Sequence, residues 1–349
     1  MGEAEEPASM ASEDTWPPRE PWVGGWLLIV CALVLAMIVV GGATRLTDSG
    51  LSITEWNFMK HLVPPLSAEG WAQEFALYQR TMEYQTQNNG MSLEEFKAIY
   101  WWEWGHRFLG QMIGLVFALP ALAFLLMGRL RGRFRVTLLL FALGAMQGAI
   151  GWWMVTSGLF DRLDVSPLRL AIHLAMAFVI LALGLWVALG AFDWPAREAR
   201  LGAPRWAPLA LMALIFVQVL FGALLAGSDG GRAYADWPTI GGEWIPATAF
   251  GQPNWWANFT EDHATQHLLH RTTGYLVALC ALALAFAALA FGRGAGRWAG
   301  AGVGLIALLQ VGLGVQTVLS ASPLGLSLAH QFGAAVLWIG AVVAARAAR

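Results

Sequence analysis

The sequence predicts an all-α integral membrane protein in which eight transmembrane helices form two four-helix bundles, one a parallel repeat of the other. The first indication is composition, since 57% of the 349 residues are hydrophobic and 13% are charged, whereas a soluble domain carries about 25% charged residues. The second is a series of apolar runs of about twenty residues, the length that crosses a hydrocarbon core of about 30 Å. The third is an internal repeat of short motifs.

The apolar runs define the spans and the organisation of the chain. We expect an N-terminal tail at residues 1–21, an N-terminal four-helix half at 22–191, a linker at 192–205 and a C-terminal four-helix half at 206–349. The predicted spans, whose ends are uncertain by a few residues, are residues 22–43, 105–127, 136–157, 168–191, 206–227, 266–292, 298–319 and 327–343.

Arginines are concentrated in alternate connections between the spans. The positive-inside rule assigns such connections to the cytoplasm, which places both termini there. The first twenty residues are acid-rich, unlike a secretory signal or a mitochondrial presequence, so we expect the bacterial inner membrane. The arginines concerned are Arg129, Arg131, Arg133, Arg135, Arg197, Arg200, Arg205, Arg293, Arg297, Arg346 and Arg349.

Two long connections are predicted on the opposite side, at residues 46–104 and 228–264. Ser67 and Ser92 are each followed by glutamate near the third position, a helix-start signal, so we expect short helices lying over the outer face. The second connection is rich in Gly, Trp and Pro. Its tryptophans suit anchoring at the lipid–water interface, and a lid over a bound group is the alternative.

The repeat places four of the seven histidines at equivalent positions, near the outer ends of the second, fourth, sixth and eighth spans. Because each half has an even number of spans, the halves are related by an axis along the membrane normal. The matches are Gly42-Ala43 with Gly222-Ala223, residues 47–50 with 227–230, Glu55-Trp56 with Asp236-Trp237, His106-Arg107 with His270-Arg271, Gln147 with Gln310, and Ser166-Pro167 before His173 with Ser322-Pro323 before His330.

One histidine pair per half predicts a metal site in each half, formed by His106 with His173 and by His270 with His330. Ionisable residues within spans are costly and usually functional. Imidazole suits Zn, Cu, Fe and Ni, but a small-ion site recruits a third or fourth ligand, and none repeats at this depth. Two facing histidines suit the axial positions of a haem iron in a bundle core. No C-x-x-C-H motif is present, so the haem would be held non-covalently.

Residues next to the first histidine of each pair also fit a haem site. Gly110 and Gly274 lie four residues after these histidines, on the same helix face, and leave room for a flat macrocycle; helix packing explains them equally well. Arg107 and Arg271 directly follow the histidines and are candidates to bind propionates through paired hydrogen bonds. Snorkelling to the interface is the alternative for both arginines.

The halves differ at one position. Glu103 lies one turn before His106, and the second half has His267 at the corresponding place. A carboxylate at a partly buried haem edge can move protons or stabilise positive charge. Glu103 is therefore the candidate catalytic residue, and the N-terminal half is the candidate reaction site. The roles of His263 and His267 stay open, and His61 is expected in solvent.

At this point the pattern resembles the haem A synthase family over nearly the whole chain from about Trp22. The resemblance implies oxidation of the C8 methyl of haem O to a formyl group, by successive hydroxylation and loss of water, giving haem A for terminal oxidases. It also implies a bound haem b on two axial histidines in the C-terminal half, with haem O as the substrate in the N-terminal half. The motifs that carry it are Glu103-x-x-His106-Arg107, His173, His270-Arg271, His330 and the run Gly41-Gly42-Ala43-Thr44-Arg45-Leu46-Thr47-x-Ser49-Gly50-Leu51-Ser52.

The first outer loop departs from many bacterial members of that family, which carry a cysteine pair there. This chain has no cysteine between residues 46 and 104 and resembles the cysteine-free branch of alphaproteobacterial and mitochondrial members. Cys31 and Cys280 lie in apolar runs and are interpreted as packing residues. The sequence therefore identifies no electron donor. A haem O synthase is a natural neighbour, because free haem O is membrane-bound and reactive, and homo-oligomerisation is left open.

Two other function classes compete with an enzyme. A di-haem b-type electron-transfer cytochrome explains the paired histidines but not Glu103, and it would stack its haems across the bilayer rather than near one face. A haem carrier would bind haem without altering it. With a net charge of −2 and no basic tract, nothing indicates a nucleic-acid partner, and the absence of a phosphate-binding loop argues against an ATP-driven pump. Membrane lipid is the remaining expected partner.

Overall fold

The computed structural model describes residues 19–55, 62–160, 162–195 and 199–348, and these residues are predominantly helical. Eight of the described helices are long and apolar enough to cross a membrane. Strand structure in the same residues is limited to two isolated bridges. The predicted fold class is thereby confirmed. The eight helices are α1 (Pro21–Leu46), α4 (Leu93–Leu126), α5 (Phe134–Phe160), α6 (Pro167–Ala191), α7 (Trp206–Gly227), α9 (His263–Phe291), α10 (Gly294–Leu319) and α11 (Leu324–Ala347).

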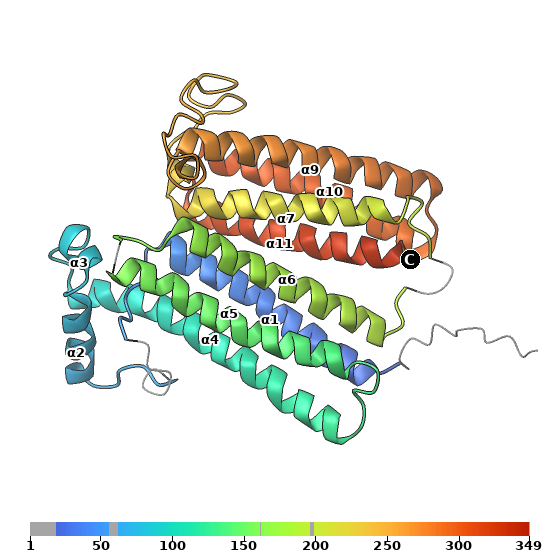
Figure 1. Cartoon of the computed structure of the whole chain (residues 1–349), viewed down its shortest axis with the longest axis horizontal. Helices are drawn as coiled ribbons and strands as arrows, with labels where there is room; N and C mark the ends of the chain where they lie inside the picture. Colours follow the sequence, from blue (N-terminus) through green and yellow to red (C-terminus); the bar gives the residue numbers. More distant parts are fainter. Residues whose placement is uncertain (1–18, 56–61, 161, 196–198, 349) are drawn as a thin grey trace, which may run out of the picture.

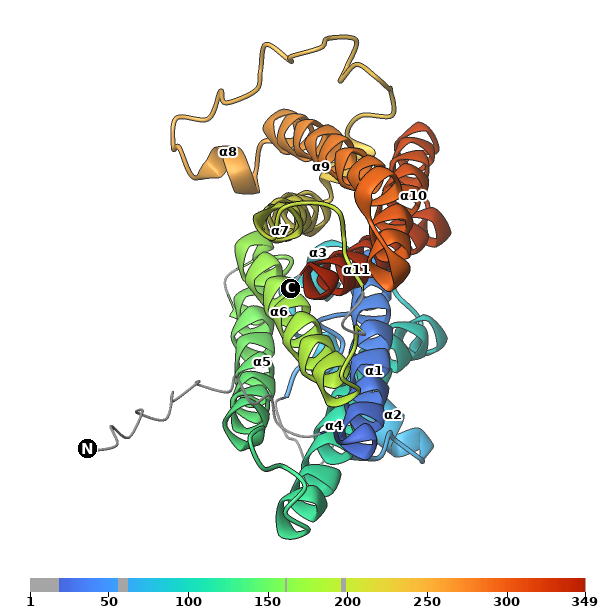
Figure 2. The same cartoon turned by 90° about the vertical axis from the view of Figure 1, so that its right-hand side faces the viewer.

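The spanning helices run side by side in two groups of four (Figure 1). One group contains α1, α4, α5 and α6, and the other contains α7, α9, α10 and α11. The groups meet through α1 and α6 on one side and α7 and α11 on the other, which leaves α4 and α5 at one edge and α9 and α10 at the opposite edge (Figure 2). Half of the most apolar stretch of α6 is buried, against 6% of that in α4 and in α5. The central helices therefore form the protein core, and α4 and α5 present most of their surface to lipid.

Side chains of the central helices bind across the junction between the groups. The Trp338 indole donates to the Phe178 carbonyl at 2.9 Å, and the two rings pack 5.9 Å apart. The Gln331 amide donates to the Ile38 carbonyl at 2.7 Å. Because lipid tails are as apolar as leucine, helices in a membrane associate through close packing and hydrogen bonds of this kind.

The outer pairs of the two halves pack differently. In the C-terminal half, Gly300 and Gly304 of α10 lie directly against Ala288 and Ala285 of α9, and small residues of this kind let helix backbones approach closely. The helices α4 and α5 of the N-terminal half contact one another far less. The repeat therefore has a tightly closed edge in one half and an open edge in the other.

The long connections lie together at one end of the bundle, called here the loop end (Figure 1). The first connection contains α2 (Ala68–Tyr78) and α3 (Met82–Thr86). Ser67 caps α2, as predicted, by accepting a hydrogen bond from the Gly70 amide. The second contains a short 3-10 turn (Gly230–Arg232) and α8 (Ala257–Thr260). His61 and residues 1–18 lie outside the described residues.

The expectation of a separate short helix at Ser92 was wrong. Ser92 and Glu95 form a capping box, and the helix that they start continues without a break to Leu126 as α4. Its first turns are held by an apolar cluster in which Tyr78, Phe96 and Tyr100 are fully buried. The predicted start of this helix lies near residue 105, because a run of apolar residues marks only the part within the membrane. The extension beyond the membrane is amphipathic. We call residues 68–100, which supply most of this cluster, the cap.

Arg45 joins the two halves at the loop end. Its guanidinium lies 2.9 Å from the Asp48 carboxylate and 2.8 Å from those of Asp164 and Asp229. It also donates to the Gly227 carbonyl at 3.3 Å. Arg45 is 8% exposed, whereas the carboxylates are 38–61% exposed. Three separate connections are thus attached to one cation.

We expect Arg45→Met to lower the free energy of unfolding by about 1–3 kcal/mol, between the values for exposed and fully buried ion pairs. In the variant, water can hydrate the three partly exposed carboxylates, which limits the loss of stability. Thermal unfolding in detergent measures the effect as a lower midpoint, and Arg131→Met, at an exposed arginine, is the control. Equal midpoints for the two variants would contradict the role given to Arg45.

Glu83 introduces a pH dependence into the cap. Its side chain is 4% exposed, one carboxylate oxygen has no partner, and the other interacts with Tyr78. Burial, together with the neighbouring carboxylates of Asp164, Glu103 and Asp48, raises the pKa of Glu83 from 4.5 to about 8. The folded cap therefore binds a proton more tightly than the unfolded cap does.

It follows that stability contributed at Glu83 is present below pH 4.5, falls as the pH rises from about 4.5 to about 8, and is constant above that window. Hydrogen exchange of the α2 and α3 amides, corrected for intrinsic rates, should accelerate over this window more in the parent than in Glu83→Gln. Glu69→Gln, at an exposed position on α2, is the control. A Glu83→Gln cap with the parent's pH dependence would refute the assignment.

Candidate functional site

The structure brings His270 and His330 together from α9 and α11. Their ring centres are 6.2 Å apart and the ring planes are inclined at 80°. Metal–imidazole bonds are about 2.0–2.1 Å long and a ring nitrogen lies about 1.1 Å from the ring centre, so two axial imidazoles on one iron have centres about 6.3 Å apart. The observed separation therefore fits one iron atom between the two rings.

His106 and His173 form the corresponding pair, from α4 and α6. They lie near one another in the structure. His173, His270 and His330 lie six or seven residues after the starts of α6, α9 and α11, and His106 lies 13 residues after the start of α4, whose first turns belong to the cap. No group of three or more His, Cys, Asp or Glu side chains in the described part of the chain could hold a small metal ion. Two ligands per site suit a haem, whose macrocycle supplies the remaining four.

Each histidine ring lies against a glycine of the preceding membrane-spanning helix. A methyl group at Gly41, Gly151, Gly222 or Gly314 would lie 2.8, 3.0, 2.9 or 2.9 Å from Cε1 of His106, His173, His270 or His330 respectively. Three of these contacts are shorter than real side chains show, and the contact at Gly151 is tighter than most, so the absence of a Cβ helps to position all four rings.

The contacts of these four glycines with the histidine rings were missed by sequence reasoning. The repeat was matched through Gly42 and Gly222, but the structure pairs Gly41 with Gly222, one residue earlier. The available signal was a glutamine four residues before the glycine, which recurs in α5, α7 and α10. The glycines that were predicted, Gly110 and Gly274, lie instead against Met37 and the Gln218 amide. Their contribution to room for a macrocycle stays a prediction.

Glutamines from the neighbouring helices contact three of the four histidines. The Gln218 amide nitrogen lies 3.1 Å from Nδ1 and 3.4 Å from Nε2 of His270. Gln147 and Gln310 lie 3.3 and 3.1 Å from Nδ1 of His173 and His330. Both also donate to the backbone carbonyl of the same histidine. These three glutamines fix the positions of the rings.

Glu103 lies at the centre of a hydrogen-bond network one turn from His106. One carboxylate oxygen accepts from the Ser52 hydroxyl at 2.8 Å and from the Ile53 amide at 2.7 Å. The other lies 2.6 Å from the Arg107 guanidinium. The Glu103 side chain is nearly fully buried, and its charge is balanced by these donors. The network attaches the first outer connection to α4.

The second half has the same network with a different central residue. Arg271 donates to Nδ1 of His267 at 3.1 Å, so the proton of this imidazole is on Nε2, which donates to the Gly230 carbonyl at 2.8 Å. His267 is 1% exposed. His263 lies nearby, with Nε2 3.0 Å from the Ser228 carbonyl. Both histidines thus hold the second connection, and neither faces the His270 and His330 pair as a further ligand.

Both candidate propionate arginines are engaged with backbone at the loop end. Arg107 donates to the Ile53 carbonyl at 2.9 Å, and Arg271 donates to the Asp236 and Thr239 carbonyls at 2.9 and 2.6 Å. Each arginine therefore has a structural task besides the predicted one.

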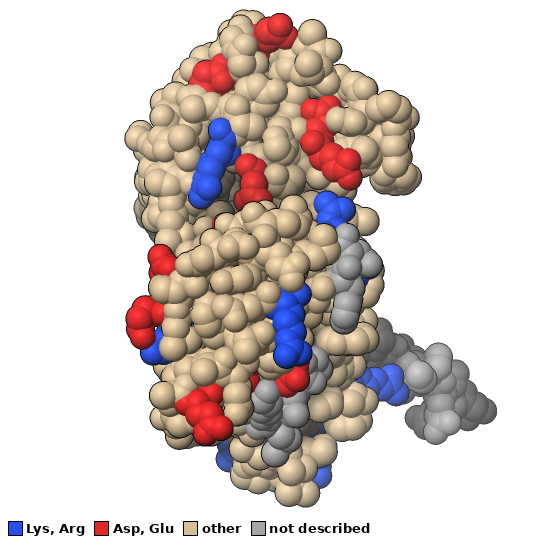
Figure 3. Space-filling model, turned by 90° about the vertical axis from the view of Figure 1, so that its left-hand side faces the viewer, with Lys and Arg blue, Asp and Glu red and all other residues tan. Residues whose placement is uncertain are grey.

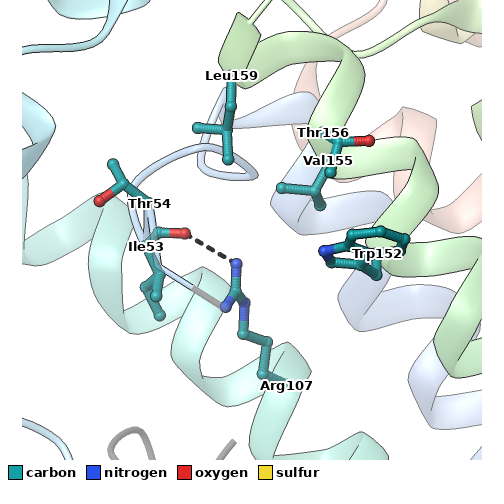
Figure 4. A pocket seen from close by; sticks show the side chains of 7 residues that line it. All are labelled: Ile53, Thr54, Arg107, Trp152, Val155, Thr156 and Leu159. Atoms are coloured by element: carbon teal, nitrogen blue, oxygen red, sulfur yellow. Dashed lines mark hydrogen bonds between the residues drawn. The ribbon is translucent and has the colours of Figure 1, made fainter. Parts of the chain in front are cut away.

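A cavity of about 210 Å³ lies beside Arg107, between the first outer connection, α4 and α5 (Figure 4). Arg107 points into the space toward the Ile53 carbonyl, and Trp152 and Val155 face it from α5. Glu103 does not line this cavity, but it binds two residues that do, Ile53 and Arg107. The cavity lining is Ile53, Thr54, Arg107, Trp152, Val155, Thr156 and Leu159.

An eight-span helical bundle that brings histidines together in two pairs defines a multi-pass membrane protein whose paired histidines suit a haem. Residues 24–342 match the family described as cytochrome oxidase assembly protein, COX15-CtaA, and the chain belongs to that family. It is 49% identical to the heme A synthase of Maricaulis maris, over 94% of this chain and 96% of that protein. It is 44% identical to the heme A synthase of Parvibaculum lavamentivorans, over 90% and 91% of the two chains. The corresponding protein of Paracoccus denitrificans is 45% identical, over 90% and 84%.

The glycine contacts give a direct test of the histidine pair. Gly314→Ala places a Cβ 2.9 Å from His330 Cε1, so the ring must move away from the iron position. We expect the purified variant to retain about 10-fold less haem in the C-terminal half, since a shift of a ligand's support typically costs 10–100-fold in affinity.

Gly312→Ala is the matched control, because a Cβ at Gly312 of the same helix meets nothing within 4 Å. Haem content per chain, from the pyridine haemochrome spectrum, is the measurement. If Gly314→Ala binds haem as well as Gly312→Ala does, Gly314 does not position the ligand.

Proposed function

We propose that this chain is a haem A synthase, which oxidises the C8 methyl of haem O to a formyl group by successive hydroxylation and so supplies haem A to terminal oxidases. Its relatives of that name match nearly its whole length. The observation that carries the proposal is an asymmetry between two otherwise similar sites. Glu103 occupies the network next to one histidine pair, and His267 occupies it next to the other.

The C-terminal half, residues 206–349, is the proposed cofactor site. His270 and His330 would bind one non-covalent haem b as axial ligands, which the 6.2 Å separation of their rings supports. Gln218 and Gln310 would orient the imidazoles, and Arg271 and Gly274 lie at the same end of the site. When bound, such a haem carries electrons singly. The closed α9–α10 edge of this half suits a group that stays in place.

The N-terminal half, residues 22–191, is the proposed substrate site, with His106 and His173 beside the iron of haem O. Its α4–α5 edge is open, and the cavity next to Arg107 lies at this edge, which suits a substrate that enters and a product that leaves. Arg107 is the proposed partner for a propionate in this half.

Glu103 is the proposed catalytic carboxylate. Ser52, the Ile53 amide and Arg107 hold it in one orientation, and fixed groups of this kind stabilise developing charge at low reorganisation cost. The oxygen that faces Arg107 is the atom we propose to accept a proton or stabilise positive charge during oxidation of the methyl group.

The proposed location is the bacterial inner membrane, with both termini in the cytoplasm. The described arginine-rich connections lie at the same end as the C-terminus, opposite the loop end (Figure 1). The loop end carries acidic and basic side chains dispersed on a mostly uncharged surface (Figure 3). The proposed haem sites lie closer to the loop end than to the cytoplasmic end, and therefore toward the periplasm. A haem O synthase is the proposed neighbour that delivers the substrate.

Expression in a host that makes haem O but no haem A tests the proposal. Extracted non-covalent haems should include haem A or its hydroxymethyl precursor. Unmodified haem alone, at two per chain, would instead favour a di-haem electron-transfer cytochrome, and unmodified haem at one per chain would favour a carrier.

In the same host, Glu103→Gln should reduce haem A formation by at least about 100-fold, the usual contribution of a positioned acid–base group. It should leave the haem spectrum of the C-terminal half unchanged. Glu94→Gln, at the exposed start of α4, is the control. If Glu103→Gln forms as much haem A as the parent protein, Glu103 takes no part in the reaction.

A further inference from the structure

We propose that Met37 makes His106 the weakly held ligand of the four, so that haem in the N-terminal half exchanges while haem in the C-terminal half stays bound. The inference rests on the proposed function for the identity of the bound group. Met37 would thereby make two sites of similar structure differ in how firmly they retain haem.

The four histidines share one local arrangement. In each, the ring lies against a glycine of the neighbouring helix, and a longer side chain stands four residues before that glycine, on the same helix face. This side chain is a glutamine three times and a methionine once. The four pairs are Gln147 with Gly151, Gln218 with Gly222, Gln310 with Gly314, and Met37 with Gly41.

Met37 and Gln218 are equivalent in the repeat, and their surroundings agree. Gln218 of α7 lies between His270 and Gly274, with its amide nitrogen 3.1 Å from Nδ1 of the histidine and 3.2 Å from a Cβ built on the glycine. Met37 of α1 lies in the same way against Gly110, with its terminal carbon 3.6 Å from the Cβ position.

The consequence for His106 is visible in its hydrogen bonding. Its Nδ1 is buried and has no hydrogen-bond partner, whereas Nδ1 of His173, His270 and His330 each lies within 3.3 Å of a glutamine amide. A methionine thioether is only a weak acceptor. Among these four histidines, His106 is the one whose ring no amide fixes.

An imidazole that binds iron through Nε2 carries its proton on Nδ1, and an acceptor there fixes the ring and makes it a better ligand. Gln218 can supply that acceptor, because its amide oxygen is buried without a partner and rotation of the amide by half a turn places oxygen at Nδ1. Met37 cannot. Loss of such support typically costs 10–100-fold in metal affinity, so the N-terminal haem should dissociate faster by about that factor.

The test replaces Met37 by glutamine and, separately, Gln218 by methionine in the full-length protein. Each protein is purified in detergent, loaded with haem B and mixed with excess apomyoglobin, which captures the haem that is released. The rate of haem loss is then measured. In the parent we expect a fast and a slow phase of haem loss, the fast phase being absent in His173→Ala. Met37→Gln should slow the fast phase by about 10-fold or more, or let a second haem survive purification where the parent retains one. Gln218→Met should accelerate the slow phase to a similar extent.

Met212→Gln is the matched control, since it makes the same change in α7 six residues before Gln218 and should alter neither phase. If Met37→Gln does not fold, Gln147→Met tests the same idea by removing the amide at His173, which should accelerate the fast phase. Unchanged phases in folded Met37→Gln and Gln218→Met would overturn the inference.

The assay does not depend on catalysis, so it separates the two claims. Phases that shift as expected in a chain that makes no haem A would support the inference and reject the proposed function. Haem A formation by a chain whose phases do not shift would support the proposed function and reject the role of Met37.

Discussion

The structure depends on the close contact between each histidine ring and a glycine on the neighbouring helix. Gly41, Gly222 and Gly314 leave no room for even a methyl group beside their rings, and Gly151 leaves very little. The contact sets the distance between helices at the depth of the site and at the same time aims each imidazole. One constraint, repeated four times, thus determines both the packing of the bundle near the loop end and the geometry in which a metal can be bound.

On this common frame, the two halves are adapted by a few side chains. The C-terminal half closes its outer edge with Gly300 and Gly304 of α10 and places an amide at each histidine. The N-terminal half keeps an open edge between α4 and α5, places Glu103 where the other half has His267, and places Met37 where the other half has Gln218. Under the proposed function, each difference would suit a resident group in the C-terminal half and a transient group in the N-terminal half.

Much of this organisation could be predicted from the sequence, because hydropathy and arginine distribution are direct consequences of membrane insertion. The eight spans, the repeat and the equivalence of the four histidines follow from those patterns, and so does the difference between Glu103 and His267. The continuity of α4 from Leu93 could not be read from hydropathy, since its first turns are stabilised by contacts with Tyr78 and Phe96 of the cap. The equivalence of Gly41 to Gly222 was missed because a one-residue shift in the repeat becomes visible only when ring and glycine are seen together.

The networks at the loop end required the structure for a similar reason. Arg107 and Arg271 each bind carbonyls of a connection that lies more than thirty residues away in the sequence, and Arg45 binds Asp164 and Asp229 of two others. No local pattern encodes such partners. These partners are determined by where the chain returns after crossing the membrane. For the same reason, the sequence could not show that Glu103 lies in a fixed network next to the cavity and does not line it.

The most direct test of the account is the electron paramagnetic resonance spectrum of the purified ferric protein. The arrangement of His270 and His330 predicts low-spin haem with two nearly perpendicular axial imidazoles, as their 80° inclination requires, and predicts that this signal is lost in His270→Ala and in His330→Ala. A high-spin signal in the parent, or a low-spin signal that survives both substitutions in a chain that also carries His173→Ala and so lacks the N-terminal pair, would contradict the claim that this pair of rings holds one iron.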